Sequence, residues 1–295
     1  MLSSFEGVIC AMVTPFAPNE EVDESGLRNH IEFLLSAGVH GLLFLGGCGE
    51  FMNLDVDERQ RVMEIAIDQT RGRVPAIVGA LSPSTPEVCA MACRAGRAGA
   101  DAVMVLPPYY VTPSAAAVET HYRRVADEAG LPIVVYNNPA RTHVSLDAAM
   151  LLKLAEINEV IAVKECDRDF TSLLDKIQKV GGRIRILSGE DDLAFPTLML
   201  GAKGGIWATS NLFPEIFVSM YQAVAAGHLE RARRFHHQLR PLWKAVFVPN
   251  HPAPLKEAMA LASRPVGKAR SPLASTEEQV ANVRSALEAV SLYGH

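Results

Sequence analysis

The feature that most constrains this chain is the regular alternation of short apolar runs with longer amphipathic stretches. The apolar runs are nearly continuous, which is typical of parallel strands buried on both faces. Helix-starting residues precede the longer stretches, for example Asp23-Glu24-Ser25 before Leu27–Ala37. We predict eight strands: Val8–Val13, Val39–Leu45, Val74–Val78, Ala102–Leu106, Ile133–Tyr136, Val160–Val163, Ile184–Leu187 and Gly205–Ala208.

Eight strands separated by helices fit most economically into a closed α/β TIM (β/α)8 barrel. An open doubly wound sheet is the alternative, but its glycine-rich phosphate turn is absent from the sequence TPFAPNEEVD. After Ser210 the pattern is wholly helical, with stretches at Pro214–Ala226, Leu229–Val248, Pro254–Ala262 and near Thr276–Ser291. We therefore predict a barrel over residues 1–225 and a C-terminal helical region over residues 226–295, packed on the barrel.

Composition excludes several classes of partner. The chain has 295 residues, a net charge of −5 and no basic block, so neither nucleic acid nor an anionic membrane is indicated. No apolar stretch reaches the ~18–20 residues that span a bilayer. The start, MLSSFEGVICAMVTPF, lacks the pattern of a signal peptide, and the five cysteines form no secreted disulfide framework. We expect a cytoplasmic protein.

The candidate reactive residues lie where the predicted strands end, since barrel active sites form at the C-terminal ends of the strands. No cluster of histidines and carboxylates has metal-ligand spacing, and the nine histidines are scattered. Nor is there a Ser-His-Asp arrangement. What remains is a lysine, tyrosines and a glycine turn: Thr14, Gly46–Glu50, Tyr109-Tyr110, Tyr136, Lys164 and Ser188-Gly189-Glu190.

Lys164 directly follows the buried run Val160–Val163. It is either a lysine that extends into solvent or a desolvated lysine whose pKa falls, leaving an amine that attacks a ketone. The resulting iminium would stabilise a carbanion on the adjacent carbon. Tyr136 ends the preceding strand, about 5 Å away across the sheet, and could shuttle protons. A core tyrosine with a satisfied hydroxyl is the other interpretation.

Two further features could bind carboxylates. The Gly46–Glu50 turn offers successive backbone N–H groups at a strand end, although glycine turns mostly serve backbone geometry. Arg141 follows the tyrosine strand and could pair with a second carboxylate, although a lone loop arginine is more often a solvated surface charge.

These residues together resemble the dihydrodipicolinate synthase / N-acetylneuraminate lyase family of pyruvate-dependent class I aldolases. The resemblance extends from Phe5 to about Lys256. It is carried, in order, by Val13-Thr14-Pro15-Phe16, Gly46–Glu50, Pro107-Pro108-Tyr109-Tyr110, Tyr136-Asn137-x-Pro139, Val163-Lys164-Glu165, Leu187-Ser188-Gly189-Glu190-Asp191 and Pro252-x-Pro254-Leu255-Lys256.

The resemblance implies a TIM barrel with a C-terminal helical region, a homotetramer built from two dimers, and no metal or organic cofactor. It assigns Lys164 as the Schiff-base lysine and Tyr136 as the proton-transfer tyrosine. It also implies that Tyr110 reaches the neighbouring subunit's site. The substrate-binding residues implied are Thr14, Gly47, Cys48, Arg141, Gly189 and Ile206.

The departures from the family pattern concern the substrate. Synthases in the family carry two hydroxyl residues where this chain has Gly47 and Cys48, so the tyrosine relay is broken unless water substitutes. Arg141 matches the synthase arginine that receives the aldehyde's carboxylate. We expect a 4-hydroxy-tetrahydrodipicolinate synthase-like lyase acting on pyruvate and aspartate semialdehyde. The alternatives are an aldolase or dehydratase of 4-hydroxy-2-oxoglutarate or a 2-oxo-3-deoxy sugar acid, and a non-catalytic relative that binds 2-oxo acids.

Overall fold

Eight parallel strands close into a barrel in the computed structural model, which describes residues 5–292. Each strand pairs with its neighbours in sequence, and β1 pairs with β8 to close the barrel. The strands are β1 (Gly7–Ala11), β2 (Gly41–Phe44), β3 (Ala76–Gly79), β4 (Ala102–Val105), β5 (Ile133–Asn137), β6 (Val160–Glu165), β7 (Arg185–Ser188) and β8 (Gly204–Trp207). The predicted TIM barrel is therefore confirmed, and the open doubly wound sheet is wrong.

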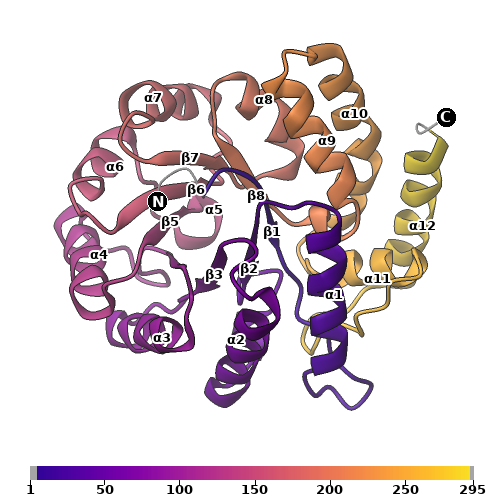
Figure 1. The fold of residues 1–295 in the computed structure, drawn as a ribbon, viewed down its shortest axis with the longest axis horizontal. Coiled ribbons are helices and arrows are strands. Elements are labelled where there is room, and N and C mark those ends of the chain that lie inside the picture. Colours follow the sequence, from indigo (N-terminus) through magenta and orange to yellow (C-terminus); the bar gives the residue numbers. More distant parts are fainter. Residues whose placement is uncertain (1–4, 293–295) are drawn as a thin grey trace.

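Helices surround the barrel, and Figure 1 shows this ring in a view along the barrel. The helices are α1 (Glu24–Ser36), α2 (Val56–Thr70), α3 (Thr85–Ala98), α4 (Ala115–Ala129), α5 (Pro139–Thr142), α6 (Ala148–Leu154), α7 (Phe170–Val180), α8 (Ala194–Met199), α9 (Pro214–Ala225), α10 (Leu229–Val246), α11 (Ala253–Leu261) and α12 (Glu277–Leu292). Within residues 5–292, three single-turn 3-10 helices occupy Phe51–Asn53, Asp191–Leu193 and Thr209–Asn211.

The strands form where the sequence predicts them, with ends that differ by no more than two residues. Nearly every strand residue is buried, as expected of strands covered on one face by helices and on the other by the barrel interior. The difference that bears on the site is in β6, which continues through Lys164 to Glu165 instead of ending at Val163. Lys164 is therefore held by the sheet itself.

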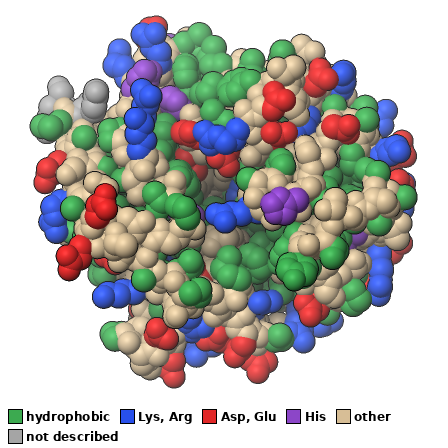
Figure 2. Space-filling model, turned by 180° about the vertical axis from the view of Figure 1, so that it is seen from behind, with side chains coloured by type: hydrophobic (Ala, Val, Ile, Leu, Met, Phe, Trp, Pro, Cys, Tyr) green, Lys and Arg blue, Asp and Glu red, His purple; other side chains and the backbone are tan. Residues whose placement is uncertain are grey.

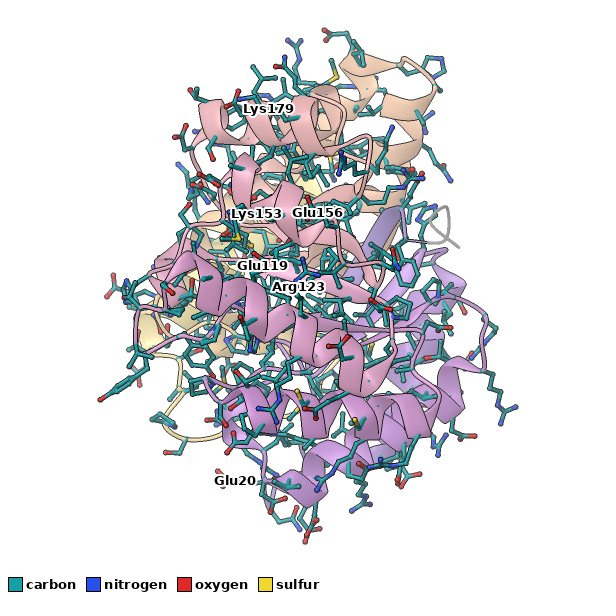
Figure 3. The ribbon with its side chains drawn as sticks, turned by 90° about the vertical axis from the view of Figure 1, so that its left-hand side faces the viewer. Glu20, Glu119, Arg123, Lys153, Glu156 and Lys179 are labelled. Carbon is teal, nitrogen blue, oxygen red and sulfur yellow. The ribbon has the colours of Figure 1, made fainter. Side chains whose placement is uncertain are left out.

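Local signals fix where the outer helices begin. At the start of α2, Asp55 and Glu58 form a reciprocal capping box, and Asp147 accepts a hydrogen bond from the N–H of Met150 at the start of α6. Figure 3 shows α4, α6 and α7 on the outside of the barrel, with charged side chains such as Arg123 and Lys179 on their outer surfaces. These helices thus bury an apolar face against the strands.

The last three helices lie on one side of the barrel, beside α9 and at the yellow end of the chain in Figure 1. They are joined to the barrel by polar contacts: the indole N–H of Trp243 donates to Thr209 Oγ1 at 3.0 Å. The guanidinium of Arg264 donates to the carbonyl of Leu212 at 2.9 Å. None of the helices among residues 5–292 is both long and apolar enough to cross a membrane.

Candidate active site

Lys164 and Tyr136 stand side by side on neighbouring strands. Their Cα atoms are register partners between β5 and β6, so both side chains leave the sheet on the same face and at the same level. The Lys164 ammonium nitrogen lies 4.6 Å from the centre of the Tyr136 ring. The side-chain amide of Asn138 donates to the Tyr136 hydroxyl at 2.9 Å, which orients the phenol. The sequence prediction that these two residues meet is confirmed.

Both side chains line a cavity of about 1410 Å³ at the C-terminal ends of the strands. Figure 2 shows a hollow near the middle of the face that is turned away from the viewer in Figure 1, with basic and acidic side chains at its rim. Of the other predicted site residues, the wall includes Gly47, Cys48, Arg141, Gly189 and Ile206. A single cavity therefore brings together residues from β5, β6, β8 and the loops that follow β2, β5 and β7.

Burial and the acidic neighbours of Lys164 shift its pKa in opposite directions. Burial lowers the pKa of Lys164, but Tyr136, Cys166, Cys48 and Asp191 raise it when they are ionised, and the net shift is upward. The predicted lowered pKa is therefore wrong: the pKa shift of Lys164 is upward, because burial is opposed by acidic neighbours whose ionisation is coupled to that of the lysine. The resting lysine is an ammonium, which must lose a proton before it can act as a nucleophile.

The tyrosine and the nearest thiol are shifted upward too. Burial raises the pKa of Tyr136 to about 12, against the opposing effect of Lys164. Burial likewise raises the pKa of the Cys48 thiol to about 11. Near neutral pH, Tyr136 is therefore a phenol that can donate a hydrogen bond or a proton, and Cys48 is a thiol rather than a thiolate.

The Gly46–Glu50 turn forms the wall opposite β6, and its backbone is tightly held. Glu50 adopts a left-handed conformation with φ 53°, an uncommon one for a non-glycine residue. The hydroxyl of Thr14 donates to the carbonyl of Gly49 at 2.7 Å. The backbone N–H groups of Gly47 and Cys48 have no hydrogen-bond partner among the other residues that the structure describes. Two donors are thus available at the cavity wall for an anion.

A buried ion pair locks this turn to the C-terminal region. The Glu50 carboxylate lies 2.6 Å from the ammonium of Lys256 on α11, and neither side chain is more than 1% exposed. The other carboxylate oxygen of Glu50 accepts from the N–H of Arg270 at 2.9 Å. The sequence analysis quoted the motifs that contain Glu50 and Lys256 without giving either a role. Nothing in the linear sequence pairs two residues so far apart.

Two predicted site residues do not line the cavity. Thr14 is buried and contacts the turn from behind, so its hydroxyl positions the turn. Tyr110 is 95% exposed, with φ 78°, and does not line the cavity of its own chain, whereas its neighbour Tyr109 does.

Gly47 and Gly189 differ in what their missing side chains imply. No atom lies within 4 Å of a Cβ built on Gly47, so a larger residue would fit there. A Cβ on Gly189 would lie 2.2 Å from the Cys166 sulfur and 3.0 Å from Lys164 Cγ, so glycine is required beside the lysine. The backbone therefore does not require glycine at position 47, and the absence of a side chain there leaves open space in the cavity wall.

The sequence analysis missed His251 and Asp191 as residues of the site. His251 lies between α10 and α11, and its ring nitrogen Nε2 is 3.4 Å from Cys48 Sγ. Asp191 accepts from Ala208 and Thr209, which ties the loop after β7 to the end of β8. Asp191 belongs to a quoted motif but was given no role, and His251 directly precedes another quoted motif, Pro252-x-Pro254-Leu255-Lys256. Among the described residues, no group of three or more histidines, cysteines or carboxylates could hold a metal ion.

A TIM barrel with a buried lysine beside a tyrosine, at the mouth formed by its strand ends, defines an enzyme with a lysine-centred active site. The profile of the dihydrodipicolinate synthetase family matches residues 4–290. The chain belongs to this family, which is one of lyases of the class I aldolase type.

Three relatives illustrate the likeness. The chain is 39% identical over 276 residues to the 4-hydroxy-tetrahydrodipicolinate synthase of Methanocaldococcus jannaschii, covering 93% of this chain and 94% of the relative. The crystal structure of the dihydrodipicolinate synthase from Thermotoga maritima matches with a TM-score of 0.94 and 32% identity, covering 98% and 99% of the two chains. The chloride-inhibited dihydrodipicolinate synthase of Acinetobacter baumannii, solved with pyruvate, matches with a TM-score of 0.93 and 28% identity, covering 97% and 99%.

Proposed function

We propose that this protein condenses pyruvate with an aldehyde through a Schiff base on Lys164, and that aspartate semialdehyde is the aldehyde, as in a 4-hydroxy-tetrahydrodipicolinate synthase. The observation that carries the proposal is the register pairing of Tyr136 and Lys164 on β5 and β6, with the ammonium 4.6 Å from the ring. The named activity of relatives with 35–39% identity supports the choice of substrates. Pyruvate is also the ligand in the related Acinetobacter baumannii structure.

Each end of the substrates has a candidate partner. The free N–H groups of Gly47 and Cys48 hold the pyruvate carboxylate, so that its 2-oxo carbon faces Lys164. Arg141 lines the cavity, is exposed, and forms no salt bridge with any carboxylate of residues 5–292. Its guanidinium therefore has free donors for the carboxylate of the aldehyde. Gly189 and Ile206 complete the wall around the lysine.

The reaction follows from these positions. Lys164 loses a proton and its amine attacks the 2-oxo carbon of pyruvate, and Tyr136 supplies the proton with which the carbonyl oxygen leaves as water. The iminium then withdraws electrons from the methyl carbon, which loses a proton to form an enamine. The enamine carbon attacks the aldehyde carbon, the new alkoxide takes up a proton, and the iminium forms again. Water then hydrolyses the iminium, which breaks the bond to Lys164, releases the product as a 2-oxo acid and restores the amine. The iminium formed on Lys164 is therefore the electron sink that allows the carbon–carbon bond to form.

A second candidate function is aldol cleavage or dehydration of 4-hydroxy-2-oxoglutarate or a 2-oxo-3-deoxy sugar acid. The open space beside Gly47 favours it, because this space would accept a bulkier substrate and lacks the hydroxyl of the synthases. A non-catalytic protein that binds 2-oxo acids would have no need of the coupled lysine and tyrosine.

Borohydride trapping tests the Schiff base. Incubation with pyruvate and borohydride should add one irreversible adduct per chain, at Lys164, and Lys164→Ala should abolish it. The matched control is Lys203→Ala, which removes an exposed lysine outside the cavity and should leave the adduct in place. A full adduct on the Lys164→Ala variant, measured by mass spectrometry, would contradict the proposal.

A substrate panel separates the two candidate functions. Coupled assays with pyruvate plus aspartate semialdehyde should give turnover that exceeds cleavage or dehydration of 4-hydroxy-2-oxoglutarate and 2-oxo-3-deoxy sugar acids. The reverse order of catalytic efficiencies would replace the synthase with the second candidate.

We further propose a cytoplasmic homotetramer built from two dimers. Tyr110 and Val111 are 95% and 62% exposed and follow β4, at the same end of the barrel as the cavity. Such an exposed pair supports contact with a second copy, in which Tyr110 would enter the neighbouring site. The five cysteines are free, in keeping with a reducing compartment. Sedimentation velocity of the wild type and of Tyr110→Asp would test the assembly, and an unaltered sedimentation coefficient would exclude Tyr110 from the interface.

A further inference from the structure

His251 stands at the mouth of the cavity in a fixed orientation. It belongs to the segment between α10 and α11 and lines the same wall as Cys48 and Arg141. Its Nδ1 lies 3.1 Å from the carbonyl oxygen of Val246. Its ring also packs against that of Phe247, with the ring centres 5.0 Å apart. These two contacts hold the second ring nitrogen, Nε2, toward Cys48 at 3.4 Å.

The hydrogen bond to Val246 determines what Nε2 can do. A carbonyl oxygen only accepts, so Nδ1 must carry the proton and donate it. Burial lowers the pKa of His251 to about 4, and the nearby positive charges of Arg141 and Lys164 act in the same direction. The imidazole is therefore neutral in the neutral pH range, and its Nε2 is a bare acceptor. The thiol of Cys48 is the donor that faces it, and a thiol is a weak donor.

The carboxylates that line the cavity are already engaged, and Asp167 among them pairs with Lys176. Glu190 and Asp192, which also line the cavity, are both paired with the guanidinium of Arg168. Asp191 is occupied by the backbone and hydroxyl of Thr209. His251 Nε2 therefore offers an uncharged acceptor, held near both the anion-binding Arg141 and the reactive lysine, that only a weak donor satisfies.

We propose that His251 is a specificity-determining residue, whose Nε2 accepts a hydrogen bond from an amino or hydroxyl group on the carbon that adjoins the carboxylate of the aldehyde substrate. This inference rests on the proposed function and refines its substrate class. While Arg141 holds the carboxylate, the neighbouring N–H or O–H displaces the Cys48 thiol from Nε2. An aldehyde without that donor leaves the acceptor with only the thiol, and is therefore bound less well in the transition state.

Three four-carbon aldehydes that differ only at this carbon provide the test. They are aspartate semialdehyde with an amino group, 2-hydroxy-4-oxobutanoate with a hydroxyl group, and succinic semialdehyde with neither. With pyruvate as co-substrate, kcat/KM of the wild type should be at least about tenfold higher for one of the two donor-bearing aldehydes than for succinic semialdehyde. The ranking of the amino and hydroxyl compounds identifies which donor the site uses.

His251→Phe keeps a ring against Phe247 and removes the acceptor, so the preference over succinic semialdehyde should fall to about twofold or less. His251→Gln keeps an acceptor oxygen and should retain part of the preference. A ratio between substrates is insensitive to a general loss of folded enzyme, which makes it a suitable readout. The proposal is overturned if the wild type shows no preference, or if His251→Phe retains it.

Different outcomes test the Schiff base on Lys164 and the specificity role of His251. If wild-type enzyme forms no borohydride adduct with pyruvate, the proposed function fails and the role of His251 fails with it. If the adduct forms but the substrate ratio is the same in His251→Phe and wild type, only the role of His251 is wrong.

Discussion

At the scale of single residues, Lys164 and Tyr136 act as one coupled pair. The potential charge of Tyr136 raises the pKa of the lysine, and the charge of the lysine lowers the pKa of the phenol, against the effect of burial in each case. Such a pair loses its protons in steps that belong to both groups. The site therefore holds an ammonium beside a phenol, and catalysis requires that a proton move before the amine can attack.

Removing the phenol should slow the proton transfers without dismantling the site. Tyr136→Phe should lower kcat by roughly 10²–10⁴-fold, because a positioned general acid–base group contributes about that much. Steady-state kinetics with pyruvate and the aldehyde measure the effect. Tyr221→Phe is the control, since Tyr221 on α9 lies outside the cavity, and it should behave like the wild type. A kcat for Tyr136→Phe within about threefold of wild type would rule out the assigned role.

The raised pKa of Lys164 predicts the pH dependence of imine formation. A higher pKa means a smaller fraction of free amine at a given pH, so the rate of adduct formation should rise with pH across the range from about 6 to about 9. Pyruvate is added at each pH and the reaction is quenched with borohydride at one fixed pH. A plateau that begins near pH 7 would indicate a lowered pKa and contradict this expectation.

At the scale of elements, the C-terminal segment holds the anion-binding turn in place. Glu50 is fully buried, and its charge is balanced by Lys256 from α11, 2.6 Å away. Lys256 also lies 4.1 Å from the centre of the Phe16 ring, near the end of β1. Three parts of the chain thus meet behind the Gly47 and Cys48 N–H groups. Loss of the ion pair between Glu50 and Lys256 would therefore loosen the turn that faces Lys164.

Breaking the buried pair should cost much more than breaking an exposed one. Lys256→Met leaves the Glu50 charge buried without its partner and should lower the free energy of unfolding by about 3–5 kcal/mol. Lys179→Met is the control, because Lys179 pairs with Asp175 on the surface of α7 and both are more than half exposed (Figure 3). Its effect should stay below about 1 kcal/mol. Urea denaturation measures both.

A double variant identifies the cause of that loss. Glu50→Gln combined with Lys256→Met removes both charges and should recover part of the stability lost in Lys256→Met. If the stability losses of the single variants Glu50→Gln and Lys256→Met simply add in the double variant, the unpaired buried charge is not the cause. Lost packing around Lys256 would then have to account for the effect.

At the scale of the whole molecule, the C-terminal helices complete the barrel enzyme. Residues beyond α9 supply Trp243, which donates to Thr209, as well as Lys256, Arg264 and Arg270, whose contacts lie within or directly behind the barrel mouth. They also supply His251 to the cavity wall. The division at residue 225 therefore stays a prediction about chain organisation, and the two parts share one site.

Truncation after residue 225 tests that division. The shortened chain would retain all eight strands but would leave Glu50 buried without Lys256 or the Arg270 N–H. It should lose the cooperative thermal unfolding transition of the full chain, measured by circular dichroism. A cooperative transition within about 5 °C of the full-length midpoint would show that residues 1–225 fold as an independent domain.

The sequence by itself determined the barrel and the central pair of the site. Eight buried apolar runs alternating with amphipathic stretches leave few architectures, and parallel register then brings the residues at neighbouring strand ends together. Lys164, Tyr136, Gly47, Cys48, Arg141 and Gly189 could be predicted to share a cavity for this reason, whereas Ile206 was expected there only from the family resemblance.

Only the tertiary structure decided the features that depend on contacts between distant parts of the chain. The upward pKa shift of Lys164 arises from four groups on different strands and loops, so its sign could not be predicted from the lysine's own segment. The pairing of Glu50 with Lys256 and the approach of His251 to Cys48 join residues about 200 positions apart. A periodic pattern specifies local structure and the face that is buried, whereas electrostatics and hydrogen bonding depend on distances that exist only after folding.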